Sequence, residues 1–243
     1  MLVDVRPASA RFVTRAPWVE SRHSFSFGPH YDPANTRFGP LVAHNDDVLA
    51  PGGEFTEHPH RGVDIVTWVV EGELAHTDSS GGAGVVRPGV AQRLSAGSGV
   101  RHVESNASSG PTRYVQMWVI ADDDEPPSYA RAEVDPALGT GGLVLVASGS
   151  APAPLSLRQP AATLLAGRLR AGQRADIPAS ALVHLYVVAG AVRLDGVTLS
   201  GGDAARVTEA AGLSLVAEQA ALTDGGAEVL IWTFGGEARN VAR

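Results

Sequence analysis

The 243-residue chain contains no cysteine, which excludes disulfide bonds, thiol nucleophiles and thiolate metal ligands together. Lysine is also missing, so all 19 basic residues are arginine. No stretch approaches the roughly 18 consecutive apolar residues of a membrane span. Residues 1–18 lack the apolar run of a secretory signal. We therefore expect a cytoplasmic protein that does not contact a membrane, and any metal site in it must use imidazole and carboxylate ligands.

The charge balance limits the classes of partner. A formal net charge of −7 argues against direct binding to nucleic acid, because binding to phosphate backbones needs clustered cations. With 44% hydrophobic and 19% charged residues, the composition is typical of a globular protein with one large or two small domains. No tail, basic patch or amphipathic helix marks a surface for a protein partner, and the sequence is compatible with a monomer or a dimer.

Short segments rich in Val, Ile, Leu and aromatic residues recur along the chain, separated by clusters of Gly, Pro, Asp and Ser. Such segments predict β-strands, and none of them carries the long apolar stripe of a helix. The predicted fold class is therefore all-β. The clearest strand segments are DIVTWVV (64–70), VVRPGVAQRL (85–94), RYVQMWVI (113–120), LVLVAS (143–148), ALVHLYVV (181–188), AGLSLVAE (211–218) and EVLIWTF (228–234).

A weak internal repeat predicts two similar halves. VVEGEL (69–74) matches VVAGAV (187–192), and RPGVAQRL (87–94) matches SGGDAARV (200–207). Between the halves, ADDDEPPSYAR (121–131) combines adjacent acids with prolines, which neither a central strand nor a helix accommodates. We interpret this segment as a solvated connection. The sequence thus predicts two antiparallel β-barrels of the jelly-roll type, at residues 1–126 and 127–243.

Two pairs of polar residues stand at spacing i, i+2 in the first half. His58 and His60 flank a proline, and His102 and Glu104 follow a glycine-rich turn. On a strand, side chains two residues apart leave the same face roughly 6–7 Å apart, so each pair can share one ion. Imidazole with carboxylate suits iron(II), manganese, cobalt, nickel, copper or zinc. Two such pairs on facing strands predict a site of three nitrogens and one oxygen, with positions left open for water or substrate.

Further motifs stand in a fixed order along the first half of the chain: RHSFSFG (22–28), YDP (31–33), NDDVLAPG (45–52), HPHRG (58–62), IVTWVVEGELAHTDS (65–79), RPG (87–89), QRLSAGSGVRHVESN (92–106) and QMWV (116–119). With these motifs in order, the sequence resembles the pirin-like family of the cupin superfamily, and it is most similar to the short bacterial pirin-like quercetinases. The resemblance is strong over about the first 120 residues and weaker beyond them. The chain stops soon after LIWTF, where longer pirins continue.

The resemblance implies a bicupin in which His58, His60, His102 and Glu104 hold one metal ion in the first barrel, with iron(II) favoured. Several members of the family cleave the flavonol quercetin with dioxygen. It therefore implies a metal-dependent dioxygenase that acts on a flavonol or a related enolic or phenolic substrate. Two alternatives stay open: an iron-redox-dependent regulatory protein that binds a partner enzyme or transcription factor, and a bicupin with a purely structural metal.

Three residues near the predicted site have competing interpretations. Glu104 is either a metal ligand or the general base that accepts the proton of a substrate hydroxyl. Gln116, on a strand expected to line the barrel, is either a residue that orients a metal-bound water or an ordinary barrel-filling residue. Asp64 is expected either to hydrogen-bond a ligand imidazole or to pair with an arginine such as Arg61.

Other residues are assigned to structure rather than chemistry. Aromatic residues at strand spacing fill cores more often than they line pockets, although a planar substrate would suit them. Short polar residues in series favour turn capping, and a lone histidine favours a surface or a packed position. The aromatic residues are Trp68, Phe25, Phe27 and Trp118, the turn residues Asn45, Asp46 and Asp47, the surface histidine His44 and the packed histidine His184.

The second half carries no counterpart of the ligand pairs. Matching the repeats places the equivalents of the four predicted ligands near Asp176, Pro178, Leu215 and Ala217. Since these residues cannot reproduce a histidine-rich site, we expect no metal centre in the second barrel.

Overall fold

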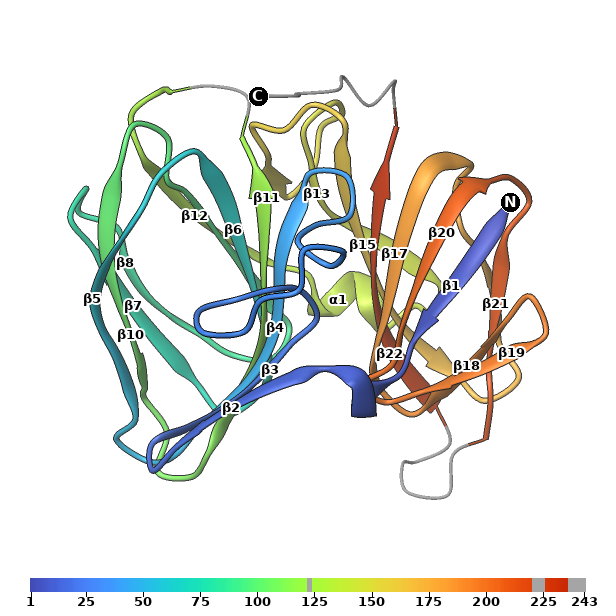
Figure 1. The fold of residues 1–243 in the computed structure, drawn as a ribbon, viewed down its shortest axis with the longest axis horizontal. Helices are drawn as coiled ribbons and strands as arrows, with labels where there is room; N and C mark the ends of the chain where they lie inside the picture. The colour runs from blue at the N-terminus through green and yellow to red at the C-terminus, as the bar shows by residue number, and fades with distance from the viewer. Residues whose placement is uncertain (122–123, 220–225, 236–243) are drawn as a thin grey trace. The chain divides into compact units, whose positions relative to one another are not determined.

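Antiparallel strands form nearly all the regular structure of the computed structural model, which describes residues 1–121, 124–219 and 226–235. These residues form two compact units, each built from two sheets (Figure 1). The first barrel comprises Arg11–Pro136 and Ala151–Pro160. The second barrel comprises Met1–Ala10, Ala137–Ser150 and the described residues from Ala161 onward. The all-β fold class is therefore confirmed.

The division of the chain differs from the single boundary predicted after residue 126. Residues 1–10 belong with the second barrel, and residues 127–136 with the first. The predicted connection at 121–131 is partly a strand, because it runs into β12 (Ser128–Glu133). Asp122 and Asp123 lie outside the described residues, so the solvated character of this acidic run stays a prediction.

The first barrel pairs a large sheet with a small one. The large sheet has the strand order β12-β9-β6-β11-β4-β3-β2, and the small sheet has the order β5-β10-β7-β8. The strands are β2 (Phe12–Ala16), β3 (Val19–His23), β4 (Leu41–Leu49), β5 (Glu54–His60), β6 (Val63–Glu71), β7 (Leu74–Asp78), β8 (Ala83–Val86), β9 (Val90–Ser95), β10 (Val100–Asn106), β11 (Thr112–Ile120), β12 (Ser128–Glu133) and the short β14 (Leu155–Ser156).

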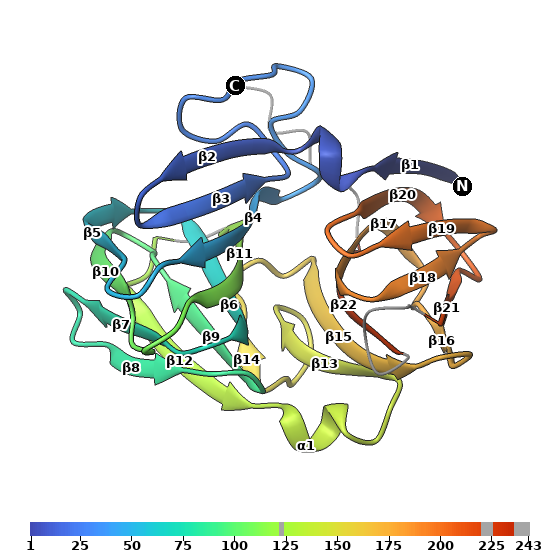
Figure 2. The same ribbon diagram turned by 90° about the horizontal axis from the view of Figure 1, so that it is seen from below.

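The second barrel repeats this plan. Its large sheet includes the order β1-β20-β17-β22-β15-β13, and its small sheet has the order β16-β21-β18-β19 (Figure 2). Its elements are β1 (Leu2–Arg6), the 3₁₀ turn η1 (Ala8–Ala10), β13 (Leu143–Ser148), β15 (Ala162–Arg170), β16 (Arg174–Asp176), β17 (Ser180–Ala189), β18 (Ala191–Leu194), β19 (Val197–Ser200), β20 (Ala204–Ala210), β21 (Ser214–Ala217) and β22 (Gly226–Phe234). Along the chain, the division between the two units falls within the helix α1 (Asp135–Leu138).

The weak sequence repeat corresponds to equivalent strands. VVEGEL spans the end of β6 and the start of β7, and VVAGAV spans the end of β17 and the start of β18. In both barrels an outer strand completes the large sheet: β12 beside β9 in the first, and β1 beside β20 in the second. β1, the first strand of the chain, is therefore the outer strand of the large sheet in the second barrel, as β12 is in the first. The sequence repeat contained no sign of this, because β1 lies outside it.

Alternation along β10 directs polar side chains into the first barrel. Val100, His102 and Glu104 are buried, whereas Arg101 between the first two is exposed. This period of two is the expected pattern of a strand with one inward face. Apolar packing stabilises the same barrel through a buried cluster of Val19, Leu49, Val69, Leu74, Val86, Val90 and Tyr114.

The glycine shared by the two repeats is required by the tight turn that joins the strands. Gly72 and Gly190 have φ angles of 76° and 77°, a left-handed conformation that side chains disfavour. A Cβ atom on Gly190 would also collide with the backbone oxygen of Gly226.

We predict that Gly190→Ala lowers the free energy of unfolding by about 3 kcal/mol or more, from left-handed strain plus the collision. Gly212→Ala is the matched control, because Gly212 has a φ of 67° but open space around its Cβ position. It should cost only about 1–2 kcal/mol. Urea titrations of both variants measure the difference, and equal losses would contradict the steric explanation.

Candidate metal centre

Two neighbouring strands of the small sheet bring three histidines together in the first barrel. His58 and His60 stand two residues apart on β5, and His102 on β10 pairs directly with His58. The ring centroids are 4.4 Å apart for His58 and His102, 4.8 Å for His60 and His102, and 4.9 Å for His58 and His60. One ligand nitrogen from each ring lies within 4.8 Å of the other two. The side chains of His58 and His102, 44 residues apart in the sequence, thus share one site.

The hydrogen bonds of these rings determine which nitrogens face the site. His58 Nδ1 lies 2.8 Å from the backbone oxygen of Thr56, which can only accept, so Nδ1 carries the proton and Nε2 has a free lone pair. His58 Nε2 lies 2.9 Å from His102 Nε2. His60 Nε2 is buried and has no hydrogen-bond partner among the described residues. The three Nε2 atoms are therefore the candidate ligand atoms.

Burial keeps two of the three rings neutral. Desolvation, with a smaller contribution from the neighbouring His58, lowers the pKa of His60 to about 4 and that of His102 to about 2. At neutral pH, His60 and His102 therefore carry no charge. A neutral imidazole is the form that can bind a metal ion.

Glu104 adds a buried carboxylate next to the histidines. It lies two residues after His102 on β10, and its pKa is raised to about 7, chiefly by desolvation and further by Asp47. Gln116 on β11 opposes this shift, because its Nε2 donates to both carboxylate oxygens at 3.0 and 2.8 Å. A carboxylate oxygen of Glu104 lies within 4.8 Å of a ring nitrogen of His102 and of one of His76. Glu104 is not part of the group that the three site histidines form.

The residues present fit a divalent metal ion. Two nitrogens that bind one ion at about 2.1 Å and a right angle are roughly 3 Å apart, which matches the 2.9 Å between His58 Nε2 and His102 Nε2. The buried Nε2 of His60 also needs a partner. A donor set of imidazole nitrogens with one carboxylate suits the transition metals predicted from the sequence. That these four residues bind the ion stays a prediction.

Gln116 is oriented by two neighbours. Its Nε2 faces Glu104, and its Oε1 accepts a hydrogen bond of 2.9 Å from the indole Nε1 of Trp118. Since a donor fixes the oxygen, the amide cannot flip without losing both contacts. Gln116 is thus placed to hold the Glu104 carboxylate, a function that the sequence did not indicate.

The four aromatic residues that the sequence assigned to the core are divided between the core and the site. Trp118 meets the ring of His60 edge to face at a centroid distance of 4.6 Å, and Phe27 meets Trp118 at 5.1 Å. Trp68 and Phe25 are each only 1% exposed and belong to the core. The apolar side of the site therefore consists of Trp118 and Phe27.

Asp64 contacts neither a ligand imidazole nor Arg61, the two partners expected from the sequence. Its Oδ1 accepts a hydrogen bond from Ser95, and its Oδ2 accepts one of 2.6 Å from the backbone N–H of Arg158. Arg61 instead lies 3.4 Å from Asp124. Asp64 thus anchors the segment Ala151–Pro160 to the first barrel.

The residues predicted to cap a turn lie within β4 instead. Asn45 Oδ1 is 3.0 Å from His23 Nδ1, and Asp46 receives two hydrogen bonds from Arg113 at 3.0 and 2.7 Å. Asp47 is buried, and desolvation raises its pKa to about 7. His44 is also fully buried, not on the surface. The prediction failed because a strand with three polar residues in a row has the local composition of a turn.

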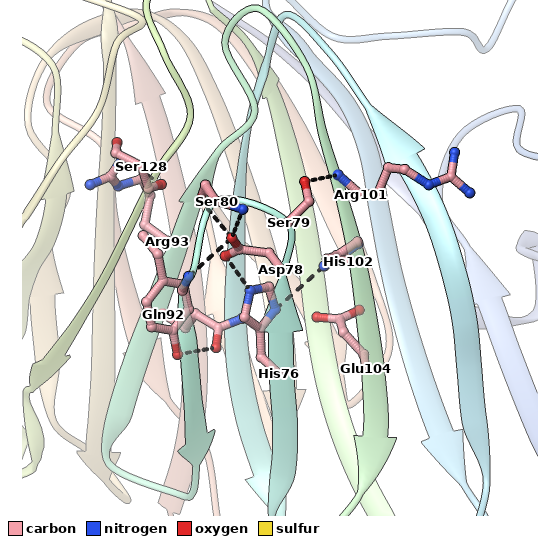
Figure 3. Close-up of polar contacts among 12 residues, drawn as sticks. His76, Asp78, Ser79, Ser80, Gln92, Arg93, Arg101, His102, Glu104 and Ser128 are labelled. Carbon is pink, nitrogen blue, oxygen red and sulfur yellow. Dashed lines mark hydrogen bonds and ion pairs between the residues drawn. The ribbon is translucent and has the colours of Figure 1, made fainter.

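His76 and Asp78 are part of the same polar cluster, although the sequence analysis assigned them no role (Figure 3). His76 on β7 pairs with Glu104, its Nδ1 lies 3.4 Å from His102 Nδ1, and its Nε2 lies 3.0 Å from Asp78 Oδ2. The sequence feature that could have identified this pair is the spacing His-x-Asp at i, i+2 within AHTDS, which has the same form as the His-x-Glu pair of His102 and Glu104.

The second barrel carries leucine and isoleucine at the matching positions. Leu74 pairs with Asn106 in the first barrel, and Val192, which matches Leu74 in the repeat, pairs with Ala217 in the second. Ala217 is therefore equivalent to Asn106. Two and four residues earlier in the sequence, Leu215 takes the place of Glu104 and Leu213 that of His102. These places lie two residues before the positions predicted from the sequence, because the preceding turn is shorter. Ile177, which donates to the carbonyl of Leu213, takes the place of His58. His184 is fully buried, as predicted.

Taken together, two jelly-roll barrels with a histidine-rich centre in one of them define a protein of the cupin class. Residues 5–119 match the family model described as Pirin, and residues 144–230 match the model described as Quercetinase C-terminal cupin domain. The chain belongs to the pirin family.

Relatives and solved structures agree with this assignment. A Mycobacterium tuberculosis protein named "Putative quercetin 2,3-dioxygenase" is 46% identical over 95% of this chain and 94% of its own length. An Escherichia coli protein named quercetin 2,3-dioxygenase is 33% identical over 89% of this chain and 94% of its own. The crystal structure of the bacterial pirin YhhW from E. coli in complex with nickel(II) superposes with a TM-score of 0.87 at 31% identity, covering 96% of this chain and 99% of that one.

We predict that Glu104→Gln changes how the stability of the metal-free protein depends on pH. The pKa of Glu104 in the folded state, about 7, lies above its ordinary value of 4.5. Between these values the folded state binds more protons than the unfolded state, so this group destabilises the protein as the pH rises. Glutamine does not titrate, so the variant should gain up to about 3 kcal/mol relative to wild type between pH 4.5 and pH 7.5.

Urea titrations of both proteins with a chelator present, at several pH values, measure this difference. Subtracting the two curves removes the opposite contribution of the histidines, which is the same in both proteins. A difference that stays constant from pH 4.5 to pH 7.5 would show that Glu104 titrates normally.

Proposed function

We propose that the protein is a metal-dependent dioxygenase of the pirin type, which cleaves a quercetin-type flavonol or a related enolic or phenolic substrate with dioxygen. The observation that carries this proposal is the convergence of three imidazole Nε2 atoms beside a buried carboxylate and an aromatic wall. The quercetin dioxygenase names of the relatives support it.

His58, His60, His102 and Glu104 would hold one divalent ion, with iron(II) as the first candidate and nickel, copper, manganese, cobalt or zinc as the others. When bound, such an ion supplies Lewis acidity and a template that brings a substrate oxygen and dioxygen together. Histidines bind a metal ion as neutral imidazoles, so a divalent ion keeps a positive charge even with the Glu104 carboxylate bound, which favours an anionic substrate oxygen.

Glu104 is suited to move the proton of the substrate hydroxyl. In the metal-free protein, burial raises the pKa of this carboxylate to about 7, which makes it a stronger base than an ordinary glutamate towards that proton. Gln116 holds the carboxylate in place through both oxygens, and Trp118 holds Gln116. Glu104 would therefore act as a base from a fixed position, whether or not it also binds the ion.

Trp118 and Phe27 would set the preference for a planar substrate. Trp118 stands edge-on to His60, and Phe27 stands edge-on to Trp118, so a flat aromatic molecule at His60 meets apolar ring surface. The same rings exclude water from this side of the site, which strengthens electrostatic interactions there.

We predict that His60→Ala lowers the affinity for iron(II) by at least about 100-fold and abolishes quercetin cleavage, since it removes one of the three convergent nitrogens. The measurement is elemental analysis of the purified protein. Anaerobic reconstitution with iron(II), quercetin turnover and oxygen uptake on the same sample then follow.

Glu57→Ala is the matched control, because Glu57 lies on the same strand but is exposed and bonds to Arg101 on the surface. It should retain metal and activity. Oxygen uptake equal to the quercetin consumed supports the proposal, and full activity of metal-free protein would refute it. Bound metal without oxygen uptake would instead favour the regulatory binding protein.

A further inference from the structure

We propose that Asp78 and His76 are positioning residues, which hold the ring of His102 in the tautomer that directs a free Nε2 lone pair into the metal centre. This inference rests on the metal centre of the proposed function but not on its reaction. Figure 3 shows the three side chains in series: Asp78 contacts His76, and His76 contacts His102.

The carboxylate of Asp78 is fixed by the turn that follows β7. Its Oδ1 accepts from the backbone N–H and the hydroxyl of Ser80, at 2.8 and 2.5 Å, and from the N–H of Gly82 at 3.1 Å. These contacts leave Oδ2 to the Nε2 of His76, at 3.0 Å. The side chains of His76 and Asp78 are both fully buried. Asp78 is thus a rigid acceptor at the start of the series.

The donor and acceptor roles then follow one from another. A carboxyl group of ordinary acidity is ionised at neutral pH, and the three donors of the turn stabilise that charge, so Asp78 can only accept. His76 Nε2 must therefore carry the proton, and in a neutral ring its Nδ1 is then a bare acceptor. The Nδ1 of His102, 3.4 Å away, donates to it. This leaves His102 Nε2 without a proton, 2.9 Å from the bare Nε2 of His58.

Packing fixes the ring planes that this series requires. The ring of His76 stacks on Tyr129 with a centroid distance of 4.7 Å and an interplanar angle of 8°. The backbone of Ser79 donates to the carbonyl of Arg101 at 2.8 Å, and the N–H of Arg101 donates to the hydroxyl of Ser79 at 3.0 Å. The turn that holds Asp78 is therefore attached to the residue that precedes His102.

Gly82 shows how tightly this arrangement is packed. A Cβ atom at this position would collide with Asp78 Oδ2 and would lie 2.7 Å from the Cβ of Tyr129. Only glycine allows the turn to close over the carboxylate while Tyr129 covers His76.

A direct ligand role for His76 fits the contacts less well. Its two nitrogens already face Asp78 and the Nδ1 of His102, which is the opposite edge of that ring from the site. The second barrel supports the same conclusion. There, Leu194 pairs with Leu215 as His76 pairs with Glu104, so the pair is missing where the ligands are missing.

The direct test is the tautomer of His102, which long-range ¹H–¹⁵N NMR reports in protein labelled with ¹⁵N-histidine. In the zinc-loaded wild-type protein we expect the His102 proton on Nδ1 and the His76 proton on Nε2. A wild-type spectrum with the His102 proton on Nε2 in the metal-free protein would overturn the proposal without any variant.

The informative variant is Asp78→Asn, because the three turn donors keep an oxygen at the Oδ1 position and turn the amide NH₂ towards His76. That donor makes His76 Nε2 an acceptor, so His76 Nδ1 donates and His102 moves its proton to Nε2. Zinc affinity, measured by competition with a chromophoric chelator, should fall about 10- to 100-fold. Asp124→Asn is the matched control, since Asp124 is exposed in the same barrel, and it should change affinity less than twofold.

The outcomes separate positioning from mere structural support. If the metal-free Asp78→Asn protein retains the wild-type tautomer of His102, the proposal is overturned, whether or not the zinc affinity of the variant falls. If that variant does not fold, His76→Gln is measured instead, and unchanged zinc affinity there overturns the proposal. Neither readout uses quercetin or oxygen, so an inactive enzyme with the expected tautomer would refute only the proposed function.

Discussion

The pairing of β5 with β10 is the constraint on which the candidate site depends. It sets His58 directly opposite His102, and the alternation of β5 then directs His60 to the same face. A slip of one residue would turn both His102 and Glu104 away from the interior. With the tautomers inferred above, two bare Nε2 atoms face each other at 2.9 Å. Lone pairs at that distance repel, so the metal-free barrel holds an arrangement that a bound cation would stabilise.

Hydrogen bonds and altered pKa values lower the free-energy cost of burying these polar groups in the first barrel. Glu104 is held by Gln116, Asp78 by its turn, and Asp46 by the guanidinium of Arg113. Burial raises the pKa of Glu104 and lowers the pKa of His60, so both groups avoid a charge that the interior would not solvate. The buried groups are thus either paired or neutral. A cation would change this balance, because it would stabilise the ionised carboxylate.

Local patterns predicted the elements and the ligand pairs, whereas contacts between distant strands escaped them. The spacing of His58 and His60 identified one site face, since a period of two is a property of a single strand. The roles of β1 and His76 depend on which strands pair, and short strands of similar composition do not reveal this. Asn45, Asp46 and Asp47 were misread as a turn because their partners, His23 and Arg113, come from other strands.

The second barrel shows that the architecture does not need the polar residues. With the same strand order, it carries Leu213, Leu215 and Ile177 where the first barrel carries His102, Glu104 and His58, and all three belong to one apolar cluster. Each buried leucine or isoleucine contributes about 1.5–3 kcal/mol relative to an exposed one. The first barrel forgoes this stabilisation at three positions and must satisfy buried polar groups as well. Because folding favours the apolar set, the polar set in the first barrel is not a requirement of the fold, which supports the proposed metal centre.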